Sequence, residues 1–287
     1  MKKTMRSAML STIAMLVVAV LSLTGVTYAW FSAANQATVG KISMTVDDNA
    51  GGIEIATTFG EWKSSVDAPA VADEYAPVST TAALTGNALS FFEGTLNPQN
   101  KNEITTTATN SNYLKFTLYF RNNGSSAITM DLTGTNIVAT ATENNDIDKA
   151  LRIGFVEWND VTIAGSSDSA DSFTSANSQT VQIYEPNATA HTANGLADGA
   201  TEGQAHAYKG VTRASGTAFN RKTDTTNLAD VTTDKALSDV TFTLNAGTYK
   251  KVDIYVWIEG QDADCQNDVS AETFDISFVF KKVEAQG

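Results

Sequence analysis

Apolar and polar residues alternate with a period of two along most of the chain. In Ala37–Val46, the apolar residues Ile42, Met44 and Val46 alternate with lysine, serine and threonine, and the strongest alternation lies in Tyr113–Arg121. Since successive side chains of a β-strand point to opposite faces, this period predicts strands that bury one face and leave the other in water. No segment after the N-terminal apolar run shows a convincing helical period.

The strand pattern recurs along the chain and predicts an all-β fold. Sheets with one buried face stack in pairs, so we expect a two-sheet antiparallel sandwich, with a barrel as the alternative. In Thr57–Asn110 the alternation is weak, which predicts loops with one or two short strands. Asn122–Ser126 is a turn, and the strands beside it form either a hairpin or neighbours in two facing sheets. The other expected strands are Ile53–Ile55, Ile128–Leu132, Asn136–Thr140, Leu151–Phe155, Val181–Tyr184, Val240–Leu244, Val252–Ile258 and Phe274–Phe280.

One long segment, Asn187–Lys235, departs from this pattern. It is rich in alanine, threonine, glycine, asparagine and aspartate and poor in large apolar residues. Because of this composition, we interpret it as a polar, loop-rich insertion on the surface. Connections of this length are usually functional or mobile. Residues 30–287 are therefore expected to form a single β-sandwich domain that carries this insertion.

Residues 1–29 have the pattern of a secretory signal peptide. Three basic residues precede the uncharged run Ala8–Val26, and the small residue Ala29 stands directly before Trp30. A basic start, an apolar middle and a small residue at the end predict cleavage by a signal peptidase between Ala29 and Trp30. The alternative is a retained membrane anchor, since a spanning helix needs roughly 20 apolar residues. In both cases the rest of the chain lies outside the cytoplasm, so we expect a secreted or cell-surface protein.

Composition limits the partners and the cross-links of the chain. The formal net charge is −13, so nucleic acid and anionic lipid would repel the protein, and we expect membrane contact only through an uncleaved signal. Cys265 is the single cysteine, so burial rather than disulfide bonding must stabilise the fold. Its side chain is either a small buried apolar group or an exposed thiol able to join two chains.

One acidic cluster resembles a cation site. Asp262, Asp264 and Asp268 could offer oxygen ligands to Ca²⁺, but Asn267 occupies the place where an EF-hand loop requires glycine. The alternative is a solvated turn between two strands. Apart from this possible Ca²⁺, the sequence indicates no cofactor.

Motifs of catalytic sites are absent from the sequence. It contains no His-Glu-x-x-His zinc motif, no Gly-x-Ser-x-Gly elbow and no phosphate-binding loop. The two histidines, His191 and His206, stand fifteen residues apart in the polar insertion, which is not the spacing of metal ligands on a helix. We therefore expect a structural or binding protein, not an enzyme.

Three stretches resemble a family of exported proteins and its export signal. Thr27–Ala29, followed by Trp30–Ser32, resembles the export signal processed by the SipW type of signal peptidase. Ala37–Ile42 is similar to the first mature strand of the TasA/camelysin (CalY) family, and Phe116–Ile128, with Phe120–Ser125 at its centre, is similar to that family's strand and NNGS turn. The long insertion Asn187–Lys235 and the aromatic pair that begins at Trp30 depart from the family pattern.

The resemblance implies a jelly-roll-like sandwich that is a subunit of an extracellular fibre in a biofilm matrix, as made by Gram-positive bacteria. In that family the mature N-terminus can leave its own fold and add a strand to the next subunit. Here the donated segment would be Trp30–Val46, with Ile42, Met44 and Val46 filling core pockets of a second copy in a homo-oligomer or filament. The alternative is that Thr38–Val46 pairs within its own sheet.

A binding module is the second functional hypothesis. Tyr255 and Trp257 alternate with the apolar residues of Val252–Ile258, which would place both aromatic rings on the outer face of a sheet. Exposed rings of this kind would form a platform for a carbohydrate, as expected for a secreted adhesin.

Overall fold

The computed structural model describes residues 37–47, 52–68, 74–96, 103–140, 150–165, 168–174, 179–185, 218–220, 234–260 and 272–283. Most of these residues lie in β-strands, and two short 3-10 turns occur at Ala170–Ser172 and Leu237–Asp239. No helix in this part of the chain is both long enough and apolar enough to cross a bilayer. The expected all-β sandwich is confirmed. Besides its two main sheets, the structure contains a third, smaller sheet.

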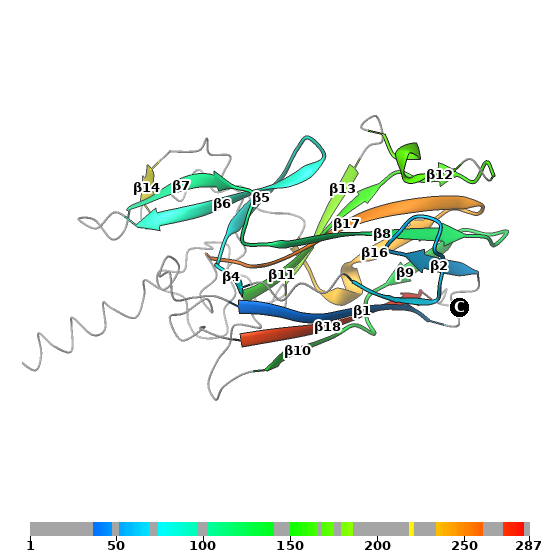
Figure 1. Ribbon diagram of the computed structural model, residues 1–287, viewed down its shortest axis with the longest axis horizontal. Helices are drawn as coiled ribbons and strands as arrows, with labels where there is room; N and C mark the ends of the chain where they lie inside the picture. The colour runs from blue at the N-terminus through cyan, green and yellow to red at the C-terminus, as the bar shows by residue number, and fades with distance from the viewer. Residues whose placement is uncertain are drawn as a thin grey trace, which may run out of the picture.

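The first main sheet contains β1 (Ala37–Val46) and β18 (Glu272–Lys282) side by side (Figure 1). β1 has the bounds that the alternation predicts, and it runs parallel to β18 although most other neighbouring strands are antiparallel. The main path of this sheet follows the order β16-β9-β18-β1-β3, with β10 also on β18 and β4 also on β1. These further strands are β16 (Thr241–Leu244), β9 (Ile128–Asp131), β3 (Ser65–Asp67), β10 (Asn136–Thr140) and β4 (Glu74–Tyr75).

The second main sheet is built around the long strand β17 (Thr248–Ile258), which lies between β11 and β8. Its main path follows the order β15-β13-β11-β17-β8-β2, and β12 also pairs with β17. The strands are β15 (Asp234–Lys235), β13 (Gln179–Tyr184), β11 (Leu151–Trp158), β8 (Leu114–Asn122), β2 (Ile53–Ala56) and β12 (Val161–Thr162).

The main core lies between these two sheets and is built from the predicted apolar faces. On β8, the side chains of Leu114, Phe116, Leu118 and Phe120 are buried, and they share one hydrophobic cluster with the inward side chains of β1, β17 and β18. The turn Asn122–Ser126 leads from β8 in one sheet to β9 in the other. Of the two arrangements considered for these strands, the structure therefore has neighbours in facing sheets, not a hairpin.

The third sheet corrects the expectation of loops with one or two short strands in Thr57–Asn110. That range contains β3, β4 and a three-stranded antiparallel unit, to which β14 adds a fourth strand in the order β14-β7-β6-β5. This sheet lies at the upper left of Figure 1. Its strands show little hydrophobic contrast between two faces, because two of them consist mainly of threonine, serine and alanine and the large apolar residues of a third do not alternate regularly. They are β5 (Ser79–Thr85), β6 (Ala88–Leu96), β7 (Glu103–Thr109) and β14 (Ala218–Asn220).

Two pieces of the predicted insertion Asn187–Lys235 lie in the described part of the chain. Ala218–Asn220 is β14, which pairs antiparallel with β7, and Asp234–Lys235 is β15, which pairs parallel with β13. The insertion is therefore tied to two different sheets at these points. Its other residues lie outside the described ranges.

The outer face of β17 is covered, which corrects the expectation of an exposed aromatic platform. The Tyr255 side chain is fully buried and that of Trp257 is 2% exposed, because Leu89 and Phe91 of the third sheet pack against them. Burial raises the pKa of the Tyr255 hydroxyl above its usual range, and the nearby ammonium group of Lys115 offsets part of this rise. Neither ring is available to stack on a sugar, so the carbohydrate hypothesis loses the residues on which it depended.

Candidate assembly site

β1 supplies the three residues that the sequence nominates for strand donation. Ile42, Met44 and Val46 are at most 4% exposed and all lie in the main core, as does Val39. β1 pairs in register with β18, so that Met44 stands opposite Phe278. In this structure β1 therefore completes the sheet of its own chain, which is the alternative that the sequence left open.

A short segment, Lys63–Ala68, covers the other edge of β1, and we call it the closing segment. At its start Lys63 exchanges two backbone hydrogen bonds with Ile55 of β2, with N–O distances of 2.8 and 2.9 Å. Farther along, β3 pairs antiparallel with β1, and Val66 stands opposite Met44. The closing segment thus joins the edge of one main sheet to the edge of the other along this side of the sandwich.

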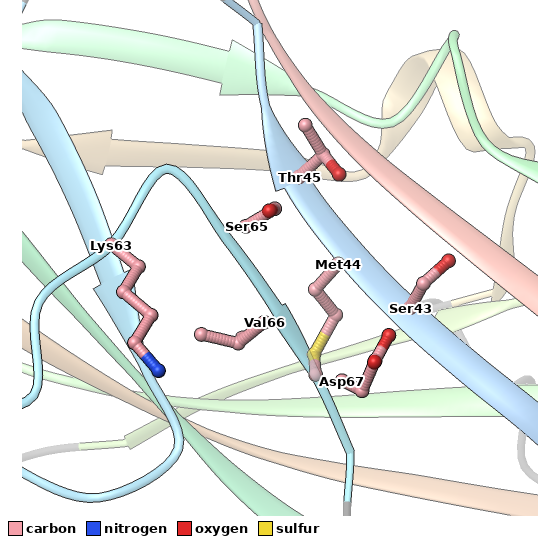
Figure 2. A pocket seen from close by; sticks show the side chains of 7 residues that line it. All are labelled: Ser43, Met44, Thr45, Lys63, Ser65, Val66 and Asp67. Carbon is pink, nitrogen blue, oxygen red and sulfur yellow. The ribbon is translucent and has the colours of Figure 1, made fainter.

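A hollow of about 290 Å³ lies where β1 meets the closing segment (Figure 2). Figure 2 shows β3 running beside β1, with the Lys63 side chain at one end of the hollow and that of Asp67 at the other. β3 pairs with only three residues of β1, whereas β18 follows β1 along most of its length. β1 is therefore held mainly by β18. The hollow is lined by Ser43, Met44, Thr45, Lys63, Ser65, Val66 and Asp67.

The pairing of β1 with β18 has one irregular point. Gly40 and Lys41 of β1 stand opposite the single residue Asp275 of β18, which is the arrangement of a β-bulge and is uncommon between parallel strands. The extra residue shifts the alternation by one position. As a result Val39 and Ile42 both face the core, each 4% exposed, although they are three residues apart.

The Asp275 side chain fits against the backbone of this bulge. Its Oδ1 accepts a hydrogen bond from the Lys41 backbone N–H, with an N–O distance of 2.7 Å. A Cβ atom placed on Gly40 would lie 2.5 Å from the same Oδ1 and 2.8 Å from Cγ2 of Thr273. Real Cβ atoms do not approach other heavy atoms so closely, so a side chain at position 40 would displace Asp275 and break its bond to Lys41.

Two polar contacts lie on the outer face of β1. The hydroxyl groups of Ser43 and Ser277 are hydrogen-bonded at 3.2 Å between adjacent strands. The Lys41 ammonium lies 3.7 Å from a carboxylate oxygen of Asp67, and both side chains are about two-thirds exposed. Exposed ion pairs contribute about 0–1 kcal/mol, so this pair adds little to the retention of β1.

The NNGS turn is organised by the buried side chain of Asn122. Its Nδ2 lies 3.0 Å from the carbonyl oxygen of Ser126, 3.3 Å from that of Leu244 and 3.0 Å from that of Asn245. Its Oδ1 accepts a hydrogen bond from the Gly124 N–H at 2.8 Å. The first asparagine of the motif is therefore hydrogen-bonded to two separate turns of the sandwich.

The remaining sequence nominations lie outside the described residues. Within the described ranges, no group of three or more histidine, cysteine, aspartate or glutamate side chains is placed to hold a metal ion. The possible Ca²⁺ ligands, the cleavage site, the cysteine and the histidines all lie outside these ranges. These residues are Asp262, Asp264, Asp268, Ala29, Trp30, Cys265, His191 and His206.

Sequence reasoning missed the bulge and its partner Asp275. A strict two-residue period from Ile42 back towards the start of β1 puts Val39 on the outer face, where the structure does not have it. The available signal was Gly40, because glycine inside a strand often marks a bulge or a close backbone approach. Asp275 gave no such signal, because an aspartate on the exposed face of a strand is unremarkable in sequence.

Comparisons with known proteins give no relative for this chain. No family model, no curated protein and no solved structure matches it.

Proposed function

We propose that this protein is an exported structural subunit that assembles into a surface or biofilm-matrix fibre by exchanging β1 between copies. A signal peptidase would release the subunit by cleavage between Ala29 and Trp30, which N-terminal sequencing of the secreted protein checks. The resemblance of the signal and of Ala37–Ile42 to the TasA/camelysin family supports this proposal. The observation that carries it is the position of β1, an apolar strand inserted between a long partner and a short cover.

The apolar side chains of β1 supply the driving force for exchange. Val39, Ile42, Met44 and Val46 are almost fully buried, and burial of each such side chain contributes about 1.5–3 kcal/mol. A sandwich that lacks β1 exposes the matching core positions and the unpaired edge of β18 to water. The same segment of a second copy fits those positions and that edge equally well, so exchange retains the buried area while it joins two chains.

The position of β1 in the chain also favours exchange. β1 lies in a groove between β18 and the closing segment. Because β1 precedes every other described strand, it can leave this groove without threading another described strand through the fold. Most of its pairing is with one strand, β18, whereas its other edge is covered in two short pieces, β3 with the rest of the closing segment and the two-residue strand β4. β1 therefore has one continuous partner and one interrupted cover, and the interrupted cover favours replacement of the strand.

A cross-chain disulfide between β1 and β18 tests the exchange. One chain carries Ser43→Cys and a second, tagged chain carries Ser277→Cys, both with Cys265→Ser. The two serine hydroxyls lie 3.2 Å apart, so cysteines at these positions can bond when β1 of one chain lies on β18 of the other. After assembly and mild oxidation, we expect a mixed dimer of the two chains on a non-reducing gel.

The matched control replaces the second chain by one that carries Ser111→Cys, an exposed position in the connection to β8. We expect no more mixed dimer from this pair than random collision gives. Equal yields from the two pairs would refute strand exchange, because they would show that the position of the cysteine does not matter.

A further inference from the structure

The groove beside β18 has a feature that simple burial does not require. An apolar strand with regular alternation would fill the inward positions without any bulge, yet this pair contains one at Gly40. The bulge leaves the inward residues of β1 with an uneven spacing, whereas their partners on β18 are evenly spaced. These partners are Phe274, Ile276, Phe278 and Phe280.

The uneven spacing disfavours a shift of the segment along β18 by two residues in either direction. If the strand moved two residues so that position 41 met the first inward site, the Lys41 ammonium would enter the core, and burial of an unpaired charge is very costly. If it moved two residues the other way, Gly40 would occupy the site of Ile42 and leave a cavity. The observed alignment alone places Val39, Ile42, Met44 and Val46 at all the inward sites.

The bulge also discriminates by size. Asp275 and Thr273 occupy the space where a Cβ atom on residue 40 would lie, at 2.5 and 2.8 Å. Asp275 is held there by its hydrogen bond to the Lys41 N–H. A side chain at position 40 turns this exposed carboxylate away, at the cost of its bond to Lys41, and also meets the methyl group of Thr273.

We propose that Gly40, Asp275 and Thr273 form a recognition point that restricts the groove to the β1 segment of a second copy of this chain. The inference rests on the proposed strand exchange and adds to it the identity and the register of the incoming strand. A strand from another exported protein can bury apolar residues in the groove. It fits only when glycine stands at the bulge and the next inward residue lies two positions after that glycine.

The test alters the recognition point and measures whether an altered donor strand pairs more often with an altered groove than with a native groove. The donor carries Ser43→Cys together with Gly40→Ala, Thr273→Ala and Asp275→Ala, so that its own groove matches its own strand and it can fold. The acceptors carry Ser277→Cys, either with the native groove or with Thr273→Ala and Asp275→Ala. All chains carry Cys265→Ser, and circular dichroism checks that each one is folded.

We expect the altered donor to give about tenfold less mixed dimer with the native acceptor than with the altered acceptor, as overpacking at a tight contact predicts. A native donor with Ser125→Ala, a change at an exposed position of the NNGS turn outside β1 and the groove, should give the parent yield with the native acceptor. Equal yields of the altered donor with both acceptors would overturn the recognition point while strand exchange stood. If the parent pair gave no mixed dimer, strand exchange itself would be refuted, and this inference with it.

Discussion

The buried side chain of Asn122 holds two turns of the sandwich together through hydrogen bonds. Its amide group lies within hydrogen-bonding distance of three carbonyl oxygens and one backbone N–H, from two turns that are far apart in sequence. The side chain is fully buried, so water cannot replace these bonds when the amide is removed. Buried polar groups without a partner each cost about 1–3 kcal/mol.

Replacement of this residue should therefore destabilise the whole sandwich. We expect Asn122→Ala to lower the free energy of unfolding by about 2–4 kcal/mol in urea denaturation. Ser125→Ala, in the same turn but at an exposed position, should change it by less than about 0.5 kcal/mol. Similar losses for the two variants would show that the turn conformation, not the buried amide, is what matters.

Residue by residue, the alternation predicted burial well where a strand is regular and one of its faces meets the main core. Met44 and the inward residues of β8 and β18 are buried as expected. The alternation could not predict that Trp257 is buried too, because a two-residue period separates two faces without saying what covers the second. It also failed at Val39, where the bulge changes the period.

At the scale of elements, the third sheet is the main feature that the sequence did not predict. Its β6 places Leu89 and Phe91 against Tyr255 and Trp257 of β17. Phe91 also stacks on Tyr113 with a centroid distance of 4.2 Å. β5 and β7 each contain one large apolar residue, and in β6 Phe91 and Phe92 are adjacent, so no regular two-residue period identifies these strands. Leu89 and Phe91 are nevertheless enough to attach the sheet.

The contribution of this attachment can be measured with two neighbouring phenylalanines. Phe91 is 1% exposed, whereas Phe92 points to the other face of β6 and is only partly buried. We expect Phe91→Ala to lower the free energy of unfolding by about 3–5 kcal/mol, because it leaves a large cavity, and Phe92→Ala to cost less than about 2 kcal/mol. A larger loss for Phe92→Ala would contradict this packing of the third sheet against β17.

At the scale of the whole molecule, the fold class followed from the sequence, but the arrangement of the candidate site did not. Alternation predicted the bounds of β1 and the burial of Ile42 and Val46, because both depend on neighbouring residues in the chain. The parallel pairing with β18, the closing segment Lys63–Ala68 and the partner Asp275 depend on contacts between residues far apart in sequence. A local pattern carries no information about such contacts.

The structure is thus a complete sandwich that includes β1, and β1 is also the strand that we propose is exchanged between copies. Within one chain, β1 closes the core and satisfies the edge of β18. Between chains, the same contacts would hold one subunit to the next. A covalent bond between β1 and its own β18 should separate these two states, because it permits the first and forbids the second.

Electron microscopy of a chain locked in this way tests the central claim most directly. The chain carries Ser43→Cys and Ser277→Cys together with Cys265→Ser, begins at Trp30, and is oxidised while monomeric so that the disulfide forms within the chain. We expect the oxidised protein to form no filaments and the same sample to form them after addition of a reductant, as the unlocked chain does. Filaments that form equally well with the intrachain disulfide intact would contradict assembly by exchange of β1.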